Sequence, residues 1–360
     1  MSTIPIYQPF LGEEETRNVA LCMKSSWISS KGSFIEKFEK KTKEFIGSSH
    51  ASSVSNGTVA LHLALLAAGV GPGDEVITTN FTYVASTNAI LMVGAIPVFN
   101  EIDPLTWNID TNLIEHNITN KTKAILVTNV YGVPCEFDEL NRLCLQYDLS
   151  LIEDAAESFG ATYRNKKSGT LADISTFSFF GNKTITTGEG GMVLTNSEKI
   201  YNKVEQLKNQ GNSPSRRYYH EVLGYNYRMT NIQAAIGCGQ LSKINQIQLL
   251  KQRVDNFYRN GLKDLVTFQY LEEHLSSSNW MTSVLFKDQN ERKKVEIELN
   301  KNKVETRPLF YPIDELPYYN SNKECLIAKN VYKRGLTLPS FPSITDKQLS
   351  LIINIIKKNV

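Results

Sequence analysis

The sequence contains few cysteines, and none of them form a C-x-x-C pair. The five stand singly and are odd in number: Cys22, Cys135, Cys144, Cys238 and Cys325. This pattern argues against a disulfide framework and against a zinc site, so we predict no metal ligands. A reducing compartment such as the cytosol fits the same pattern.

Long apolar runs are also missing, as is an excess of either charge. No apolar stretch is long enough to cross a bilayer, and residues 1–15 lack the basic and apolar regions of a signal peptide. The 39 basic and 37 acidic residues give a net charge of +2 and are spread along the chain, which leaves no electrostatic footprint for nucleic acid. We therefore expect a soluble, cytoplasmic protein that binds neither membranes nor nucleic acid.

Helical and strand-like segments alternate over the first two thirds of the chain. Residues 58–70 have the apolar spacing of a helix and end in a glycine-rich GPGD, after which residues 75–79 indicate a strand. The same order continues with helices expected at 82–95, 136–148 and 200–211, and strands at 96–103, 123–132, 149–157, 174–180 and 190–196. Such alternation predicts parallel strands joined by helical crossovers and covered on both faces.

From about residue 240 the pattern of expected helices and strands changes. A long polar helix is expected at 244–262, short strands around 279–286 and a final amphipathic helix at 346–359. No Pro/Gly/Ser-rich linker separates the two parts. We predict a large, doubly wound, mostly parallel α/β domain over residues 1–240 and a small α+β domain over 241–360, sharing an interface.

One stretch, SFFGNKTITTGEGGMVLTN at 178–196, places a lysine among apolar and small neutral residues beside a glycine cluster. Two interpretations are open for Lys183. The glycines can form a tight structural turn with a solvated lysine, or they can shape the backbone so that the amine performs chemistry.

Other polar residues follow predicted strands, where ligands of open parallel sheets bind. Ser55–Thr58 (SNGT) precede the helix at 58–70 and can cap it or present donors to a phosphate. Asp154 ends a predicted strand and can cap a turn or face a buried cation. Tyr83 can belong to the core or offer a ring face to a ligand.

Together these residues complement pyridoxal 5'-phosphate. That cofactor needs a lysine amine, a carboxylate for its pyridine nitrogen, donors for its phosphate and an aromatic ring against its face. These four groups are supplied, in the same order, by Lys183, Asp154, Ser55–Thr58 and Tyr83. The sequence therefore favours a pyridoxal-phosphate enzyme over a solvated loop at Lys183.

The motifs around these residues resemble the DegT/DnrJ/EryC1/StrS family of sugar aminotransferases, which share the fold of aspartate aminotransferase (fold type I). Matching segments cover residues 4–15, 25–40, 53–65, 73–90, 152–161, 175–196, 224–237, 305–312 and 338–345. Within the family, these segments are most similar to 4-aminotransferases of the perosamine-synthase type. The resemblance extends over nearly the whole chain.

The resemblance implies a role for each matching residue. Lys183 and Asp154 match the catalytic pair, the Schiff-base lysine and the partner of the pyridine nitrogen. The implied cofactor contacts are Gly57, Thr58, Tyr83, Asp154, Glu157, Ser178, Lys183 and Asn226, where Glu157 lies near the ring oxygen and Asn226 reaches the cofactor of a partner subunit in a homodimer. A solvated helix glutamate and a local loop asparagine are the plainer alternatives for Glu157 and Asn226.

The resemblance also implies a reaction. Glutamate donates an amino group, which passes to the C4 ketone of a GDP- or dTDP-linked 4-keto-6-deoxyhexose for a surface polysaccharide such as the O-antigen of lipopolysaccharide. Candidate substrate contacts are Lys31, His220, Arg228, Arg307 and Asp314. Asn129 and Asp314 stand where the family often has histidine, a difference that we expect to alter contacts to the sugar or nucleotide.

Three alternatives stay open from the sequence. One is a 3-aminotransferase acting on a 3-keto sugar nucleotide. A second is a sugar dehydratase, which Lys183 argues against because such relatives carry histidine there. The third is a regulator that has kept the fold without activity.

Overall fold

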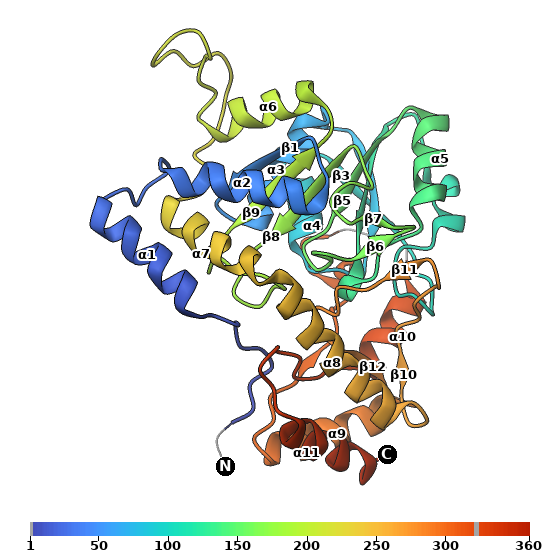
Figure 1. Ribbon diagram of the computed structural model, residues 1–360. Coiled ribbons are helices and arrows are strands. Elements are labelled where there is room, and N and C mark those ends of the chain that lie inside the picture. Colours follow the sequence, from blue (N-terminus) through green and yellow to red (C-terminus); the bar gives the residue numbers. More distant parts are fainter. Residues whose placement is uncertain (1–2, 320–323) are drawn as a thin grey trace.

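A computed structural model describes residues 3–319 and 324–360 (Figure 1). Its largest sheet has seven strands in the order β1-β9-β8-β5-β4-β2-β3. These are β1 (His50–Val54), β2 (Glu75–Thr79), β3 (Ile96–Asn100), β4 (Thr122–Thr128), β5 (Ser150–Asp154), β8 (Ile174–Ser178) and β9 (Gly191–Thr195). The prediction of a large, mostly parallel sheet is confirmed.

Strand β9 departs from the expected parallel pairing. It is antiparallel to both β8 and β1, whereas the other neighbouring pairs in this sheet are parallel. The reason is local, because residues 179–190 return the chain beside β8 without a helical crossover. This short return contains Lys183.

Helices cover both faces of the large sheet. Successive residues of a strand point to opposite faces, so Ile152 packs with α3, α4 and α6 while Leu151 packs with α5 on the other side. Helices α2 and α7 cover that second side near β8 and β9, and α1 packs on α7. The bounds are α1 (Glu13–Ser25), α2 (Ser33–Ile46), α3 (Gly57–Ala67), α4 (Ala85–Met92), α5 (Phe137–Tyr147), α6 (Glu198–Lys208) and α7 (Asn231–Ser242).

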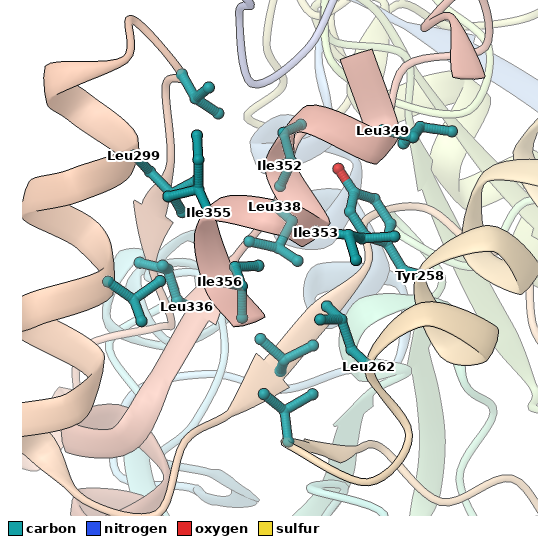
Figure 2. Packing of buried hydrophobic residues seen from close by; sticks show 14 of the residues in the cluster. Tyr258, Leu262, Leu299, Leu336, Leu338, Leu349, Ile352, Ile353, Ile355 and Ile356 are labelled. Atoms are coloured by element: carbon teal, nitrogen blue, oxygen red, sulfur yellow. The ribbon is translucent and has the colours of Figure 1, made fainter. Parts of the chain in front are cut away.

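A second, antiparallel sheet has the order β10-β12-β14-β13. Its strands are β10 (Thr267–Phe268), β12 (Ser283–Leu285), β13 (Arg307–Pro308) and β14 (Gly335–Thr337), and its helices are α8 (Ile244–Leu262), α9 (Gln289–Lys301), α10 (Leu326–Arg334) and α11 (Asp346–Lys357). Ile352 and Ile356 of α11 pack with Tyr258 of α8 and Leu299 of α9 in one core (Figure 2). The amphipathic pattern at 346–359 thus marks a helix that covers this core.

The N-terminal segment joins this second core. Ile4 forms a bridge with Val304, and the N–H of Ile6 donates to Glu305 at 2.9 Å. A small sheet of β6 (Thr162–Tyr163), β7 (Lys166–Lys167) and β11 (Leu275–Ser276) also crosses between the two parts. The division into residues 1–240 and 241–360 stays a prediction, although the boundary falls close to the turn between α7 and α8.

The remaining elements are short 3-10 turns, η1 (Thr111–Leu113), η2 (Glu115–Asn117), η3 (Val130–Gly132) and η4 (Ile313–Glu315). Among the helices in residues 3–319 and 324–360, none combines the length and apolar character needed to cross a membrane.

Candidate active site

A cavity of about 570 Å³ opens at the carboxyl ends of β1, β2, β5 and β8. Trp280, Met281, Arg307 and Phe310 close it from the other part of the chain. Seven predicted cofactor residues line this cavity: Gly57, Thr58, Tyr83, Asp154, Glu157, Ser178 and Lys183. The carboxyl ends of parallel strands meet at one edge of a sheet. Residues that lie up to 126 positions apart in the sequence, from Gly57 to Lys183, therefore come together here.

The start of α3 forms one wall of the cavity. Asn56 is the N-cap, and its side chain accepts a hydrogen bond from the N–H of Val59 at 3.0 Å. The first N–H groups of a helix have no partner inside it, and those of Gly57 and Thr58 have none elsewhere in the described part of the chain. They are donors at the positive end of the helix, which suits an anion.

Two glycines allow the backbone to close around this wall. A Cβ on Gly57 would lie 2.8 Å from Cβ of Ser178, and a Cβ on Gly191 would lie 2.4 Å from the carbonyl oxygen of Asn56. Both distances are shorter than real Cβ contacts. Gly191 is thus needed for packing of β9 against the start of α3, which explains part of the glycine cluster near Lys183.

Asp154 lies at the floor of the cavity and is only 4% exposed. Its carboxylate accepts hydrogen bonds from Ser86 Oγ at 2.6 Å and from the N–H of Ala156 at 3.1 Å. Burial raises the pKa of Asp154, while the bond from Ser86 and the charge of Lys183 oppose that change. A cation brought into the cavity would favour the ionised carboxylate further.

Lys183 and Glu157 face one another beside Asp154. Lys183 Nζ lies 3.9 Å from Glu157 Oε1, and the other carboxylate oxygen accepts a 2.7 Å bond from the N–H of Tyr131. Burial lowers the pKa of Lys183 and raises that of Glu157, while their mutual attraction works against both shifts. Lys183 is therefore an amine that loses its proton more readily than a solvated lysine.

Aromatic side chains that sequence reasoning missed form the opposite wall. Tyr131 stacks on Phe310, with ring centroids 4.9 Å apart, and on Trp280 at 6.1 Å. Lys183 Nζ lies 4.2 Å from the centroid of the Trp280 ring. Tyr131 has φ = 52°, a left-handed conformation that is rare for an aromatic residue and recurs at functional sites. The position of Tyr131 close to the end of β4 is the one feature of the sequence that could have pointed to a place in the site.

Of the predicted substrate residues, only Arg307 lines the cavity among the described residues of this chain. Lys31 is exposed, and His220 pairs through Nδ1 with the carbonyl oxygen of Gln210. Asp314 accepts a 2.9 Å bond from the side chain of Asn80.

Asn226 and Arg228 lie together outside the cavity lining. Arg228 donates to Asn226 Oδ1 from Nε at 3.1 Å and from Nη2 at 2.8 Å, and to Asn209 Oδ1 at 3.0 Å. Because the amide oxygen of Asn226 accepts both bonds, its NH₂ group is directed to donate elsewhere.

Asn129 is fully buried and is not among the residues that line the cavity. Its amide nitrogen lies 2.8 Å from Glu153 Oε1 and 3.0 Å from each of the hydroxyls of Ser158 and Ser168, so its two hydrogens are shared among three acceptors. Glu153 is fully buried, and its carboxylate also accepts hydrogen bonds from the hydroxyls of Ser168 and Ser175 and from the N–H of Gly169. The expectation that Asn129 alters contacts to the sugar or nucleotide stays a prediction.

Comparison with known proteins matches residues 9–357 to the DegT/DnrJ/EryC1/StrS aminotransferase family. The chain belongs to this family. It is 46% identical to a GDP-perosamine synthase of Escherichia coli O157:H7 over 98% of this chain and 97% of that protein, and 44% identical to one of Vibrio cholerae over 98% of each. The PLP form of the putative sugar aminotransferase Spr1654 from Streptococcus pneumoniae superimposes with a TM-score of 0.93 at 26% identity, over 100% of both chains.

Family membership confirms the resemblance seen in the sequence and the fold type I architecture. The chain is a pyridoxal-phosphate-dependent aminotransferase. Its cavity fits that cofactor, because it offers unpaired N–H donors for a phosphate, a buried carboxylate and a buried amine. The side-chain oxygen of Asn182, another lining residue, is also buried and lacks a hydrogen-bond partner in the described part of the chain.

Proposed function

We propose that this aminotransferase acts on C4 of a nucleotide-linked 4-keto-6-deoxyhexose, converting GDP-4-keto-6-deoxymannose to GDP-perosamine. The observation that carries the proposal is the meeting of Lys183, Asp154 and the start of α3 in one cavity of a chain that is 46% identical to a GDP-perosamine synthase. The 44% identity to a second such enzyme supports the same substrate.

Each cofactor residue has a proposed task. Gly57 and Thr58 donate their N–H groups to the phosphate, and Ser178 adds its hydroxyl from the opposite side. Asp154 holds the proton on the pyridine nitrogen, and Tyr83, which is 60% exposed at the cavity mouth, covers the ring. When bound, pyridoxal phosphate supplies an electron sink for bond breaking at the substrate carbon.

Lys183 is the proposed cofactor-linking residue and proton carrier. Burial lowers the pKa of Lys183, so Nζ gives up its proton more readily than a solvated lysine and, once neutral, can take a proton from the substrate carbon and return it. Glu157 accepts from the N–H of Tyr131 and faces Nζ at 3.9 Å, so its carboxylate, when ionised, stabilises the protonated amine. The rings of Tyr131, Trp280 and Phe310 cover one side of the space around this amine.

Arg307 is the proposed contact for the diphosphate, since it is the predicted basic residue that lines the cavity. The roles of Lys31, His220, Arg228 and Asp314 as substrate contacts require a second subunit or a movement of the chain, and we keep them as lesser candidates.

A homodimer with shared sites completes the proposal. Asn226 presents its amide NH₂ group outward and would donate to the cofactor of the partner subunit. The amino donor is L-glutamate, and the product serves a surface polysaccharide such as an O-antigen. We place the enzyme in the cytoplasm, a setting that suits its five buried cysteines.

Steady-state kinetics test the substrate. Purified enzyme would receive L-glutamate with either GDP-4-keto-6-deoxymannose or dTDP-4-keto-6-deoxyglucose, and kcat/KM would be compared. We expect preference for the GDP sugar and loss of at least ~100-fold in Lys183→Ala. Preference for the dTDP sugar would replace GDP by dTDP in the assigned substrate. Failure of the enzyme to aminate either sugar would reject the 4-amino assignment.

A further inference from the structure

The turn that carries Lys183 is held by two side chains distant in sequence. The hydroxyl of Tyr7 donates to the carbonyl oxygen of Lys183 at 2.7 Å, and the indole N–H of Trp280 donates to the carbonyl oxygen of Asn182 at 2.7 Å. Two successive peptide units of the turn are therefore fixed from outside the large sheet.

Both donors belong structurally to the second part of the molecule. Tyr7 packs on the core that contains Ile4 and Val304, and Trp280 lies a few residues before the start of β12. Lys251 of α8 links them, because its Nζ donates to the carbonyl oxygens of Trp280 at 2.8 Å and Ser340 at 3.0 Å. The same Nζ lies 5.2 Å from the centroid of the Tyr7 ring.

We propose that Tyr7 and Trp280 form a clamp that orients Lys183 for proton transfer. Both are positioning residues, and the clamp transmits the placement of the second part of the molecule to the lysine amine. This inference rests on the proposed role of Lys183 as the cofactor-linking residue.

Three features favour positioning over simple packing. The lysine side chain is long and flexible, so small shifts of its backbone move Nζ, and misplacement by about 1 Å can slow a reaction ~100-fold. The Trp280 ring lies over Nζ, at 4.2 Å from its centroid, so one residue holds both ends of the lysine. Burial raises the pKa of Tyr7, which keeps its hydroxyl a donor at neutral and alkaline pH.

The test removes one donor at a time and leaves a ring in place. Tyr7→Phe deletes the hydroxyl, and Trp280→Phe deletes the indole N–H. Tyr258→Phe is the matched control for the first, because its hydroxyl makes a 2.9 Å bond to the Pro339 carbonyl in the α8–α11 core. Trp107→Phe is the control for the second, because its buried indole N–H has no partner among the described residues.

Two readouts are combined. In the protein without cofactor, hydrogen–deuterium exchange of residues 179–187 should increase in both clamp variants and stay unchanged in both controls. In the loaded protein, the single-turnover rate with L-glutamate should fall ~3- to 10-fold in each clamp variant, as expected for loss of one hydrogen bond, with the glutamate KM within about twofold. Exchange and rates equal to those of the controls would overturn the clamp.

Borohydride reduction followed by peptide mass spectrometry separates this inference from the proposed function. Attachment of the cofactor at a residue other than Lys183 would overturn the proposed role of that lysine. Attachment at Lys183 with unchanged exchange and rates would overturn the clamp alone.

Discussion

At the scale of single residues, the cavity places three ionisable side chains out of water. Lys183 lies between Glu157 and Asp154, and burial disfavours the charged form of all three. The two carboxylates stabilise the protonated amine, so they limit how far its pKa falls. The balance leaves an amine that gives up its proton more readily than a solvated lysine.

Glu157→Gln tests this balance. Since the Glu157 carboxylate raises the pKa of Lys183, its removal should lower that pKa further. The rate at which cofactor-free protein takes up pyridoxal phosphate depends on the neutral amine, so the pH profile of this rate should move to lower pH. Glu205→Gln, which removes the partner of another lysine at 2.6 Å, is the control. An unmoved or alkaline-shifted profile would contradict the account.

Lys251 gives a stability prediction. Burial lowers the pKa of this amine to about 7, and a neutral amine has two donors for its two carbonyl partners. Between pH 7 and the ordinary lysine value of about 10.4, the unfolded chain therefore binds one more proton than the folded chain, so stability rises with pH. Relative to Lys251→Met, the wild-type free energy of unfolding should increase by about 1.4 kcal/mol per pH unit above pH 7.

Urea denaturation at pH 7 and pH 9 measures this difference. Lys263→Met, at an exposed lysine just beyond α8, is the control and should follow the wild type at both values. The same pH dependence in Lys251→Met as in the wild type would contradict this prediction, because it would show that folded Lys251 keeps its proton between pH 7 and pH 9 as the unfolded chain does.

At the scale of elements, the start of α3 is the feature that prepares the site for an anion. Asn56 caps the helix and leaves the N–H groups of Gly57 and Thr58 toward the cavity. Close approach of Gly57 to Ser178 keeps this end of the helix against β8. The anion site is thus a product of helix capping and backbone packing together.

Gly57→Ala should weaken cofactor binding by roughly tenfold, because its Cβ would lie 2.8 Å from Cβ of Ser178 and push the helix start away. Alanine favours helix over glycine by about 1 kcal/mol, so protein stability itself need not fall. Absorbance titration with pyridoxal phosphate gives the affinity. Gly71→Ala, where a Cβ meets open space, is the control, and equal affinities in the two variants would refute the packing role.

The elements that sequence could predict are those with a regular pattern. Strands β2, β4 and β5 and helices α3, α5, α8 and α11 follow clear apolar periodicity, and their order implied the sheet. Strand β1 (HASSV) was missed because it is short and polar, and the direction of β9 depends on the return through residues 179–190.

Within the site, sequence located the residues that follow strands and missed those brought in by tertiary packing. Asp154 and Lys183 could be predicted from the sequence because the carboxyl ends of parallel strands meet at one edge of the sheet. Tyr7, Tyr131, Trp280 and Phe310 come from four separate segments, and no local spacing relates them. Their meeting depends on how the second sheet packs against the first.

At the scale of the whole molecule, the segment between α6 and α7 projects from the body (Figure 1). It carries Tyr218 and Leu223, which are 80% and 82% exposed, close to Asn226. Exposed apolar side chains beside a residue proposed to enter a partner's site support a dimer contact there.

Leu223→Asp should therefore weaken dimerisation by roughly tenfold or more and lower cofactor affinity with it, since the partner's site would lose Asn226. Sedimentation velocity across a concentration series measures the association. Leu145→Asp, at a leucine of α5 that is 87% exposed, is the matched control and should leave the dimer intact. A monomeric wild-type protein, or an unaffected dimer in Leu223→Asp, would contradict the shared site.

The central claim is that Lys183 moves an amino group to C4 of the sugar. Its most direct test supplies ¹⁵N-labelled L-glutamate and GDP-4-keto-6-deoxymannose to the enzyme and to Lys183→Ala, and locates the label by NMR. The account predicts ¹⁵N on C4 of the product with the wild-type enzyme and no labelled sugar with Lys183→Ala. Label on another carbon, no transfer by the wild type, or transfer at the wild-type rate by Lys183→Ala would contradict it.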